Sequence, residues 1–479
     1  MRIEKFFSSL FISLLFASIL WGFGWIALGA NFSYPNAEDL GIAANFNQLG
    51  FTSCFSKMLI YNDGRYSANA FHGISPLVWS TYRYYLFLPV FSVLLFWVSL
   101  FILFKSLLDN FKNSIAAIFS GVSIVALFSV FISTSATIYC WGGTLVYVYP
   151  CSFTLLWIGF IVYYFHTARG IYFVLSALSL FVSTGFNEMF LGLTPVLLLL
   201  LFLYTFFFEK KELLTITSLI AVGLSGICLL VFAPGSSQKI GSNFSISERL
   251  LDMSFWGYFL NHYKISAAEF FSHTPIWTSI LFLGIAIAGY LKKEKLNNSK
   301  LIFFLIASLS VLISTLPMAL IFFLPMAAMG EVQERVFTPI YVLLFVSTVM
   351  LLGITVSVFI KKVYPLYKNI MLAILACIHL IGLTAMDGNY KSIKRAYLDG
   401  ETSIFASQME HRFTMFESAA RTDNKWKKVS IPALNSYPKI IYYPTEPEPN
   451  RKSVNWNFAY EEYFKLDEVL LIGDTLVRF

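Results

Sequence analysis

Eleven long apolar runs constrain the fold of this chain more than any other feature of its sequence. A helix needs about 20 apolar residues to cross the hydrocarbon core of a bilayer, and most of these runs come close to that length. Because lipid offers the backbone no hydrogen-bond partner, such runs fold as helices. They lie near 6–28, 84–107, 114–134, 151–166, 171–187, 191–208, 213–233, 276–291, 301–325, 337–360 and 369–386.

The composition points to the same class of protein. Hydrophobic residues make up 57% of the 479 residues and charged residues only 13%, whereas soluble domains carry roughly 25% charged residues. Lys and Arg are spread over short connections and form no cluster, which argues against a nucleic acid as partner. We therefore expect an all-α polytopic membrane protein with about 11 transmembrane helices, surrounded by the lipid bilayer.

The distribution of Lys and Arg predicts the orientation of the chain. With the N-terminus in the cytoplasm, the short inner connections hold fourteen Lys and Arg residues, and the longer outer connections before residue 387 hold seven. Cytoplasmic loops carry such an excess in membrane proteins. This predicts a transmembrane domain over 1–386 and an extracytoplasmic domain over 387–479. The outer loops are then 31–83, 135–150, 234–275 and 326–336.

Two outer segments carry local structure of their own. In loop 234–275, apolar residues recur at helical spacing from Leu251 to Phe270, which predicts an amphipathic helix on the outer interface. In the tail, the runs Glu468–Ile472 and Thr475–Phe479 flank a Gly-Asp pair, which is typical of a β-hairpin. We expect the tail to form a small α+β domain on the outer face.

Two cysteines, Cys140 and Cys151, bracket one short outer loop. In an oxidising compartment they are able to form a disulfide if that loop folds back. Two buried thiols at the ends of spans are the alternative. Spacing alone leaves both interpretations open.

The first outer loop holds the residues with the greatest chemical potential. Glu38 and Asp39 follow the first span, and Asp63, Arg65 and Tyr66 come later in the same loop. A carboxylate fixed at the bilayer surface can accept a proton from a hydroxyl group, which is the task of a general base. The guanidinium of Arg65 can bind phosphate oxygens through two parallel hydrogen bonds.

A structural interpretation of the same residues is also open. Asn36 is able to cap a helix that carries Asp39 in its first turn and ends at Gly50. Ala43, Phe46 and Leu49 would then form its buried stripe. Asp63 and the glycine after it are able to form a turn.

Further candidates lie later in the chain. Asn187 and Glu188 interrupt a nearly continuous apolar stretch at an outer boundary, where an ionisable group is costly unless it is functional or paired. An exposed carboxylate in a tight turn is the alternative. Arg335 stands at the outer mouth of the tenth span, either as a phosphate ligand or as an interfacial anchor. No nucleotide-binding, zinc-protease or Ser-His-Asp motif occurs, and we predict no metal site.

An acidic pair directly after the first span, in a chain of eleven spans with an outward tail, resembles the GT-C superfamily of glycosyltransferases. In that family the first outer loop carries a Glu-Asp, Asp-Glu or Asp-Asp pair, and the sugar donor is linked to a polyprenyl phosphate. The size, the Phe-rich spans and the polar tail look most like bacterial and phage-borne O-antigen glucosyltransferases of the serotype-converting type.

Those proteins also carry a Gly-Arg pair, a carboxylate after a mid-chain span and a later Pro-Gly-Asn-x-x-Arg motif. Gly64-Arg65 and Glu188 match the first two. Pro234-Gly235 matches the third in part, because Ser236 and Lys239 replace the Asn and the Arg. Lysine meets a phosphate as a point charge and lacks the guanidinium fork.

The resemblance implies inverting transfer of a hexose, with glucose the expected sugar, from a polyprenyl-phosphate donor to a glycan acceptor such as O-antigen or lipopolysaccharide. It implies a bacterial inner membrane, no cofactor, with a divalent cation left open, and a companion flippase and donor synthase. It also implies roles for the candidates: Asp39 as base with Glu38 beside it, Glu188, Asn187, Asp63, Arg65 and Tyr66 for substrate, and Arg65, Lys239 and Arg335 for phosphate.

We expect Asp39, Glu188 and Arg65 to converge on one cavity, and Asp39→Asn to abolish transfer while leaving expression intact. Two other functions stay open. A flippase or transporter of lipid-linked glycans predicts charges buried within spans, of which the sequence has few. An O-antigen ligase or polymerase relies on basic and His residues in a late loop instead of an acidic pair after span one.

Overall fold

The computed structural model describes residues 2–472 except 62, 80, 109–111, 132, 237–252, 294–297, 327–333, 360–364, 387, 423–425 and 444–455. Each of the eleven apolar runs folds as a helix. These helices are α1 (Arg2–Asn31), α6 (Phe87–Leu107), α7 (Asn113–Val130), α9 (Trp141–Thr167), α10 (Gly170–Thr184), α11 (Thr194–Phe208), α12 (Leu213–Phe232), α16 (Thr274–Lys293), α17 (Asn298–Met326), α18 (Phe337–Phe359) and α19 (Pro365–Ala385).

The all-α, multi-pass architecture is therefore confirmed. Within the described residues, nine helices are long and apolar enough to cross a membrane. A tenth candidate is the pair α15 (Met253–Ser272) and α16, bent by 71° at the break between them. The short apolar helix α10 covers only 15 residues. Crossing by all eleven helices stays a prediction.

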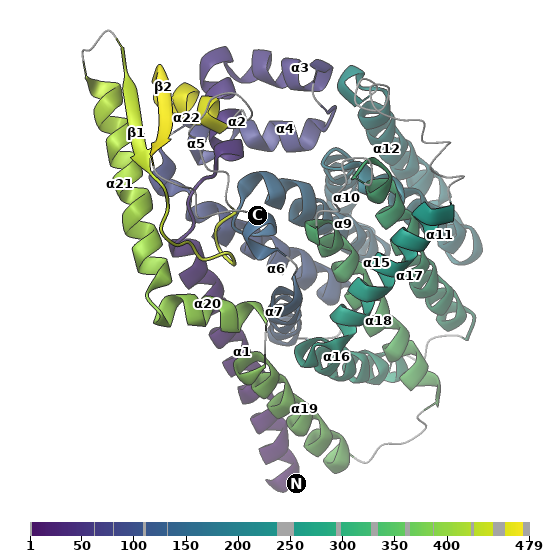
Figure 1. The fold of residues 1–479 in the computed structure, drawn as a ribbon. Coiled ribbons are helices and arrows are strands. Elements are labelled where there is room, and N and C mark those ends of the chain that lie inside the picture. Colours follow the sequence, from purple (N-terminus) through teal and green to yellow (C-terminus); the bar gives the residue numbers. More distant parts are fainter. Residues whose placement is uncertain are drawn as a thin grey trace.

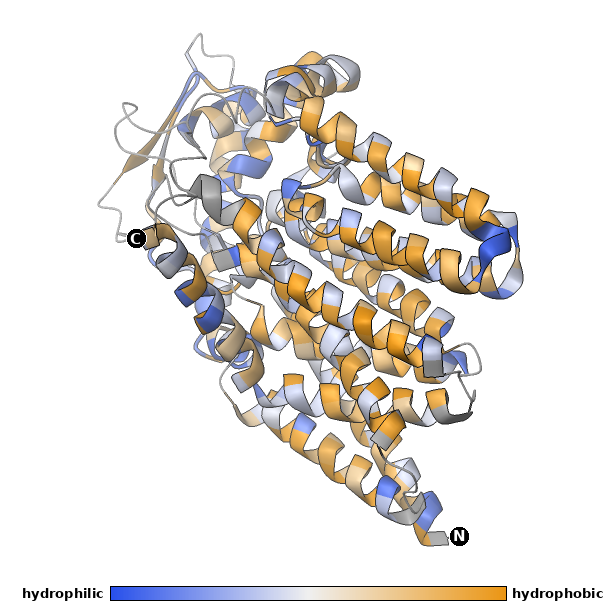
Figure 2. Cartoon of the chain, turned by 90° about the vertical axis from the view of Figure 1, so that its right-hand side faces the viewer, coloured by the Kyte–Doolittle hydropathy of each residue, from blue (hydrophilic) through white to orange (hydrophobic). Residues whose placement is uncertain are grey.

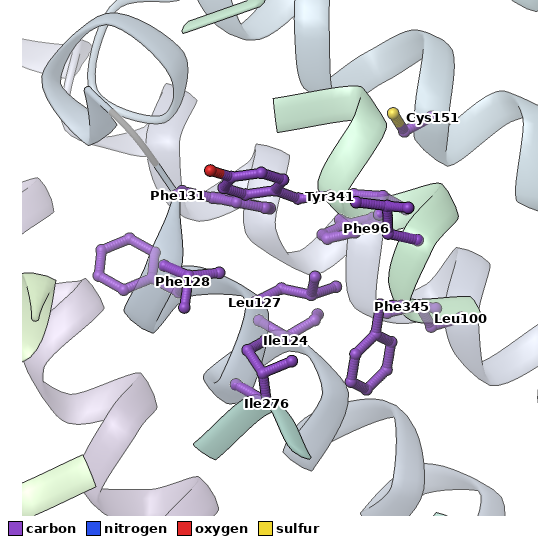
Figure 3. Packing of buried hydrophobic residues seen from close by; sticks show 14 of the residues in the cluster. Phe96, Leu100, Ile124, Leu127, Phe128, Phe131, Cys151, Ile276, Tyr341 and Phe345 are labelled. Carbon is purple, nitrogen blue, oxygen red and sulfur yellow. The ribbon is translucent and has the colours of Figure 1, made fainter. Parts of the chain in front are cut away.

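The bundle is held together by close side-chain packing. In lipid the hydrophobic effect does not drive helices together, so van der Waals contact between their side chains matters more. Figure 3 shows the centre of the main apolar cluster, where five helices meet. The side chains there include Phe96 and Leu100 of α6, Ile124, Leu127 and Phe128 of α7, Cys151 of α9, Ile276 of α16, and Tyr341 and Phe345 of α18.

The first connection covers one end of this bundle with short helices. These are α2 (Ala37–Leu49), α3 (Phe51–Tyr61), α4 (Tyr66–Gly73), α5 (Pro76–Trp79) and the 3-10 turn η1 (Tyr82–Tyr84). The structural interpretation of Asn36 is confirmed, because its side chain accepts a hydrogen bond from the Asp39 N–H at 2.9 Å and Gly50 ends α2 with φ 75°. Leu49 does not belong to the buried stripe, since 41% of it is exposed.

Short elements join the remaining helices. They are α8 (Thr134–Thr137), η2 (Glu188–Leu191), η3 (Lys210–Glu212) and η4 (Glu334–Val336). The predicted amphipathic helix in loop 234–275 is α15, which buries Phe255, Phe259 and Phe270 along one side. Residues 237–252 of that loop lie outside the described part of the chain.

The C-terminal segment, residues 388–472, combines helices with a small sheet. It contains α20 (Asn389–Leu398), α21 (Glu401–Arg421), β1 (Lys428–Pro432), α22 (Trp456–Phe464) and β2 (Glu468–Ile472). The strand at 468–472 is confirmed, but it pairs in parallel with β1, from Lys428 opposite Glu468 to Pro432 opposite Ile472. The second strand of the expected hairpin, 475–479, lies outside the described residues.

The C-terminal segment packs on the first connection. Figure 1 shows α21, β1, β2 and α22 on one side of the molecule, next to α2 and α5. Gly41 of α2 lies so close to α22 that an added Cβ would be 3.1 Å from the Ala459 Cβ. Tyr82 stacks on Phe413 of α21 with ring centroids 4.0 Å apart. In Figure 2 the long apolar helices run between this polar end and the N-terminus.

Of the two interpretations of Cys140 and Cys151, the disulfide is wrong and the two buried thiols are confirmed. Both thiols are free and buried, because α9 begins at Trp141 and the loop predicted at 135–150 is largely helical. Cys140 is the N-cap residue of α9 and Cys151 lies eleven residues further along this helix, so the helical rise separates their Cα atoms by about 16 Å. A disulfide allows no more than about 7 Å.

Pro150 lies inside α9, where the sequence predicted a helix boundary. Proline has no N–H, so the carbonyl four residues earlier, that of Val146, loses its helical partner. The side chain of Asn187 replaces it, donating a hydrogen bond from Nδ2 to the Val146 oxygen at 3.1 Å. The same side chain accepts from the Met189 N–H at 3.0 Å and so begins η2. Asn187 thus joins the η2 turn to α9.

This arrangement predicts thermodynamic coupling between Pro150 and Asn187. Asn187→Ala leaves the Val146 carbonyl without its donor, whereas in a Pro150→Ala background the restored N–H supplies one. We expect Asn187→Ala to cost about 1 kcal/mol less in the Pro150→Ala background than in the wild type. Unfolding of the four proteins in detergent measures this difference. Purely additive effects would contradict the assignment.

Candidate functional site

Asp39 is buried at the start of α9. Its side chain accepts a hydrogen bond from the Gly142 N–H at 2.9 Å and a second from the Trp141 N–H at 3.3 Å. Backbone N–H groups in the first turn of a helix have no partner within the helix, and the helix dipole favours a negative charge there. No side chain of α9 caps its own N-terminus. Asp39, which is only 2% exposed, therefore caps α9 from α2.

The close approach that this requires depends on a glycine. An added Cβ at Gly143 would overlap the Ala136 carbonyl of α8. At Gly142 it would lie 3.6 Å from Asp39 Oδ1 and 3.7 Å from Glu38 Oε1. The Cys-Trp-Gly-Gly sequence at 140–143 thus permits α8, α2 and the first turn of α9 to meet.

The hydrogen bonds around the Asp39 carboxyl suit both its neutral and its ionised form. The Tyr85 hydroxyl lies 2.5 Å from its Oδ2 and 3.0 Å from the Tyr139 carbonyl. An ionised Asp39 accepts the Tyr85 proton, and a neutral Asp39 donates to the Tyr85 oxygen while Tyr85 donates to the carbonyl. Burial raises the pKa of Asp39 to about 6, although the hydrogen bonds from Tyr85 and Gly142 lower it.

Glu38 differs from its neighbour in exposure and contacts. It is half-buried and stands beside Gly142, and its charge acts on both Asp39 and Arg335. Of the two carboxylates, Glu38 is the one that a ligand can reach. The expectation that Asp39 faces a substrate therefore does not fit its burial.

Arg65 and Glu188 form an ion pair with three short N···O contacts. The Arg65 Nε lies 3.1 and 3.0 Å from the two carboxylate oxygens, and Nη2 lies 2.7 Å from Oε2. The side chains are only 15% and 26% exposed. The Asp63 carboxylate lies 3.7 Å from the same Nε. The carboxylates of Glu188 and Asp63 raise the pKa of Arg65 above its ordinary value although burial lowers it.

The turn that presents Arg65 contacts the loop after α12. Gly64 has φ 65°, and an added Cβ there would overlap Ser236 Oγ. Ser236 donates a hydrogen bond to the Asp63 carbonyl at 2.9 Å. The Pro-Gly-Ser sequence at 234–236 thus lies on the Asp63–Arg65 turn. Lys239, expected to bind phosphate, lies outside the described residues.

Tyr66 and Asn187 have structural contacts in place of the expected contacts with substrate. The Tyr66 hydroxyl donates to the Phe181 carbonyl at 2.6 Å and lies 2.9 Å from Thr184 Oγ1, both in α10. Asn187 is fully buried and bonded to Val146 and Met189. These two residues explain how α4, α10 and η2 are placed around Glu188.

Both groups of charges are attached to the first turns of α9. Asp39 binds Gly142, and Asn187, next to Glu188, binds Val146. These anchor points are four residues apart, or about 6 Å along the helix axis. Tyr147 of α9 interacts electrostatically with Arg65 and Glu38, and its ring centroid lies 5.8 Å from the guanidinium carbon of Arg335. The structure therefore brings the first-loop acidic pair, Arg65, Glu188 and Arg335 to one end of one helix.

Among the residues that the structure describes, acidic groups outnumber basic groups at this site. Glu38, Asp39, Asp63 and Glu188 carry four carboxyl groups, whereas Arg65 and Arg335 carry two guanidinium groups. No group of three or more His, Cys, Asp or Glu among the described residues is arranged to hold a metal ion. A cavity of about 350 Å³ lies elsewhere, between α21 and β1, and none of the candidate residues lines it.

Several neighbours of the site escaped the sequence analysis. Tyr85, Tyr147 and Tyr443 are three of 26 tyrosines, and no local pattern distinguishes them. His72 of α4 is buried beside Asp63 and Arg65, and burial lowers its pKa to about 4, so its ring is neutral at pH 7. A histidine followed by glycine and isoleucine gives no signal of such a position.

The raised pKa of Asp39 predicts a specific pH dependence of stability. A carboxyl whose pKa rises from 3.8 to about 6 on folding binds its proton more tightly in the folded state. Its contribution to stability is therefore complete below pH 4 and is lost as the pH rises to about 6, amounting to about 3 kcal/mol. We expect Asp39→Asn to lack this dependence in unfolding curves in detergent.

Asp399→Asn is the matched control, because it makes the same chemical change at an exposed position of the C-terminal segment. It should keep the wild-type dependence between pH 4 and 6. If Asp39→Asn and the wild type have parallel stability profiles over this range, the buried, proton-binding state of Asp39 is wrong.

No protein-family model, no characterised protein and no solved structure matches this chain. The features that bear on function are those of the site itself: a half-buried carboxylate, a buried carboxyl that caps a helix, and two guanidinium groups at the polar end of an apolar bundle.

Proposed function

We propose that this protein is a membrane glycosyltransferase that transfers a hexose from a polyprenyl-phosphate donor to an extracytoplasmic glycan acceptor, with inversion at the anomeric carbon. One observation carries the proposal. Glu38, held at the start of α9 by its capping neighbour Asp39, interacts electrostatically with Arg335 at the end of a bundle whose sides are lipid-compatible. A lipid-linked phosphate donor requires a base and a cation in such a place.

The reaction requires little from the protein. The acceptor hydroxyl attacks the anomeric carbon, the new C–O bond forms, and the bond to the phosphate oxygen breaks. Glu38 takes the hydroxyl proton, and the departing polyprenyl phosphate keeps the bonding electron pair. Arg335 offsets the charge that develops on this phosphate. Because the donor already carries a good leaving group, no nucleotide site is needed.

The contacts of these residues favour other roles than those that the resemblance suggested. Asp39 positions Glu38 and α9, whereas Glu38 contacts the acceptor. Arg65 is bound through Nε and Nη2 to Glu188, so it holds Glu188 in place and adds positive charge. Arg335 is the principal phosphate ligand, and Glu188 and Asp63 border the sugar.

The orientation of the chain belongs to the same proposal. We place the N-terminus in the cytoplasm of a bacterial cell, the helices in its inner membrane and the C-terminal segment outside. The excess of Lys and Arg in the short connections supports this topology. The N-terminus and the polar end with the C-terminal segment lie at opposite ends of the apolar bundle in Figure 2.

A flippase or transporter receives less support. Such proteins use ionisable side chains buried within their spans. In the described part of the chain, the buried Asp, Glu, Lys and Arg side chains are Asp39, Arg412 and Glu461. All three lie outside the candidate spans.

The proposal predicts that Glu38→Gln removes catalysis but preserves the fold. Loss of a general base lowers kcat by about 100- to 10,000-fold. The KM for the donor should change little, because the phosphate contacts remain. The assay measures transfer of radiolabelled glucose from polyprenyl-phosphate glucose to a lipopolysaccharide acceptor by the purified protein in vesicles.

Glu410→Gln, an isosteric change at an exposed position of α21, is the matched control and should retain full activity. Full activity of Glu38→Gln would contradict the assignment of the base. Transfer of preassembled oligosaccharides in place of single sugars would favour the ligase or polymerase alternative and contradict the proposed reaction.

A further inference from the structure

Arg335 contacts aromatic rings from two distant parts of the chain. Its guanidinium carbon lies 5.8 Å from the ring centroid of Tyr147 and 5.4 Å from that of Tyr443. Tyr147 belongs to the second turn of α9, and Tyr443 follows β1 in the C-terminal segment. Both distances are within the range of cation–π attraction, about 6 Å.

The electrostatics of Arg335 reflect these contacts. Burial lowers its pKa, but the phenol groups of Tyr147 and Tyr443 and the carboxyl of Glu38 raise it above its ordinary value. The residue thus remains a permanent cation beside the base of the proposed reaction.

The chain on which Tyr443 lies is fixed to both the bundle and the C-terminal segment. The Ile440 carbonyl accepts a hydrogen bond from Thr134 of α8 at 2.8 Å. Ile441 is buried in the main apolar cluster of the bundle. Tyr442 is buried against Phe405 of α21, with ring centroids 4.8 Å apart. Tyr443 therefore has a defined position over Arg335.

Contact with two rings matters for a side chain as flexible as arginine. An unrestrained Arg loses rotamer freedom when it binds a ligand, and this loss weakens binding. Rings that hold the guanidinium reduce the loss. The planar donors can then meet the oxygens of a phosphate edge-on, the geometry that arginine uses for bidentate binding.

We infer that Tyr443 completes the candidate site from the C-terminal segment: together with Tyr147 it positions Arg335 for the phosphodiester of the lipid donor, which becomes the monoester of polyprenyl phosphate on transfer. The inference rests on the proposed function for the identity of the ligand. It gives the C-terminal segment a role in the reaction, as the carrier of a positioning residue.

Two substitutions of Tyr443 distinguish the effect of its aromatic ring from the effect of its side-chain volume. Tyr443→Phe keeps the aromatic face and Tyr443→Leu removes it. In the first measurement, Arg335 is modified with an arginine-specific dicarbonyl and quantified by peptide mass spectrometry. We expect faster modification in Tyr443→Leu and wild-type rates in Tyr443→Phe. Tyr397→Leu, at an exposed tyrosine of the C-terminal segment, is the control and should match the wild type.

In the second measurement, the KM for polyprenyl-phosphate glucose should rise roughly 3- to 30-fold in Tyr443→Leu, as expected for loss of a cation–π contact. It should stay at the wild-type value in Tyr443→Phe, with kcat little changed in both. Polyprenyl monophosphate in vesicles should protect Arg335 of the wild type from modification, and inorganic phosphate at the same concentration should not.

The outcomes distinguish this inference from the proposed function. Equal modification of Arg335 in the wild type and Tyr443→Leu overturns the positioning role even if transfer is observed. A raised KM in Tyr443→Phe equal to that in Tyr443→Leu overturns the role of the ring. A third outcome is that Tyr443→Leu speeds the modification of Arg335 as expected but polyprenyl monophosphate gives no protection. The contact between Tyr443 and Arg335 is then correct, whereas the phosphate ligand and the proposed function are wrong.

Discussion

Two backbone amides at the start of α9 donate hydrogen bonds to the carboxylate of Asp39, and the arrangement of the site follows from this contact. It joins the first connection of the chain to a helix that begins about one hundred residues later. It also sets the position of Glu38, since the neighbouring residue in α2 cannot move independently. A carboxylate is well suited to this task because it accepts from several donors and complements the positive end of a helix. Its burial, which raises its pKa, is the cost of the arrangement.

The ion pair of Arg65 and Glu188 is also positioned by α9, through a different contact. Pro150 leaves the Val146 carbonyl without a helical donor, and Asn187 supplies one. The next residue, Glu188, is thereby brought to Arg65, and the ion pair neutralises two groups that are costly to bury alone. Helix α9 thus aligns the acidic pair with the ion pair, and the C-terminal segment adds Tyr443 beside Arg335.

The sequence predicts local structure here better than distant contacts. Helix α2 follows from Asn36 and Gly50, and each of the eleven apolar runs gives a helix, because capping and hydropathy are local properties. The charge of Glu188 near lipid predicts that it is paired, but nothing local names Arg65 as its partner. The helical course of α9 through Pro150 and the parallel pairing of β1 with β2 both depend on groups far away in the chain. The different positions of Glu38 and Asp39, one half-buried and the other buried, are not visible in the sequence, because the two acidic residues are adjacent in one motif.

The central claim is that Asp39 holds the N-terminus of α9, and amide hydrogen exchange of that turn tests it most directly. The Gly142 N–H has no acceptor within the helix, so its protection depends on the Asp39 carboxylate. The Trp141 N–H also donates to the Tyr85 hydroxyl at 3.0 Å, so Gly142 is the deciding probe. We predict strong protection of the Gly142 amide in the wild type and much faster exchange in Asp39→Ala, with the interior of α7 as unchanged reference. Equal protection of Gly142 in both proteins would contradict this role of Asp39.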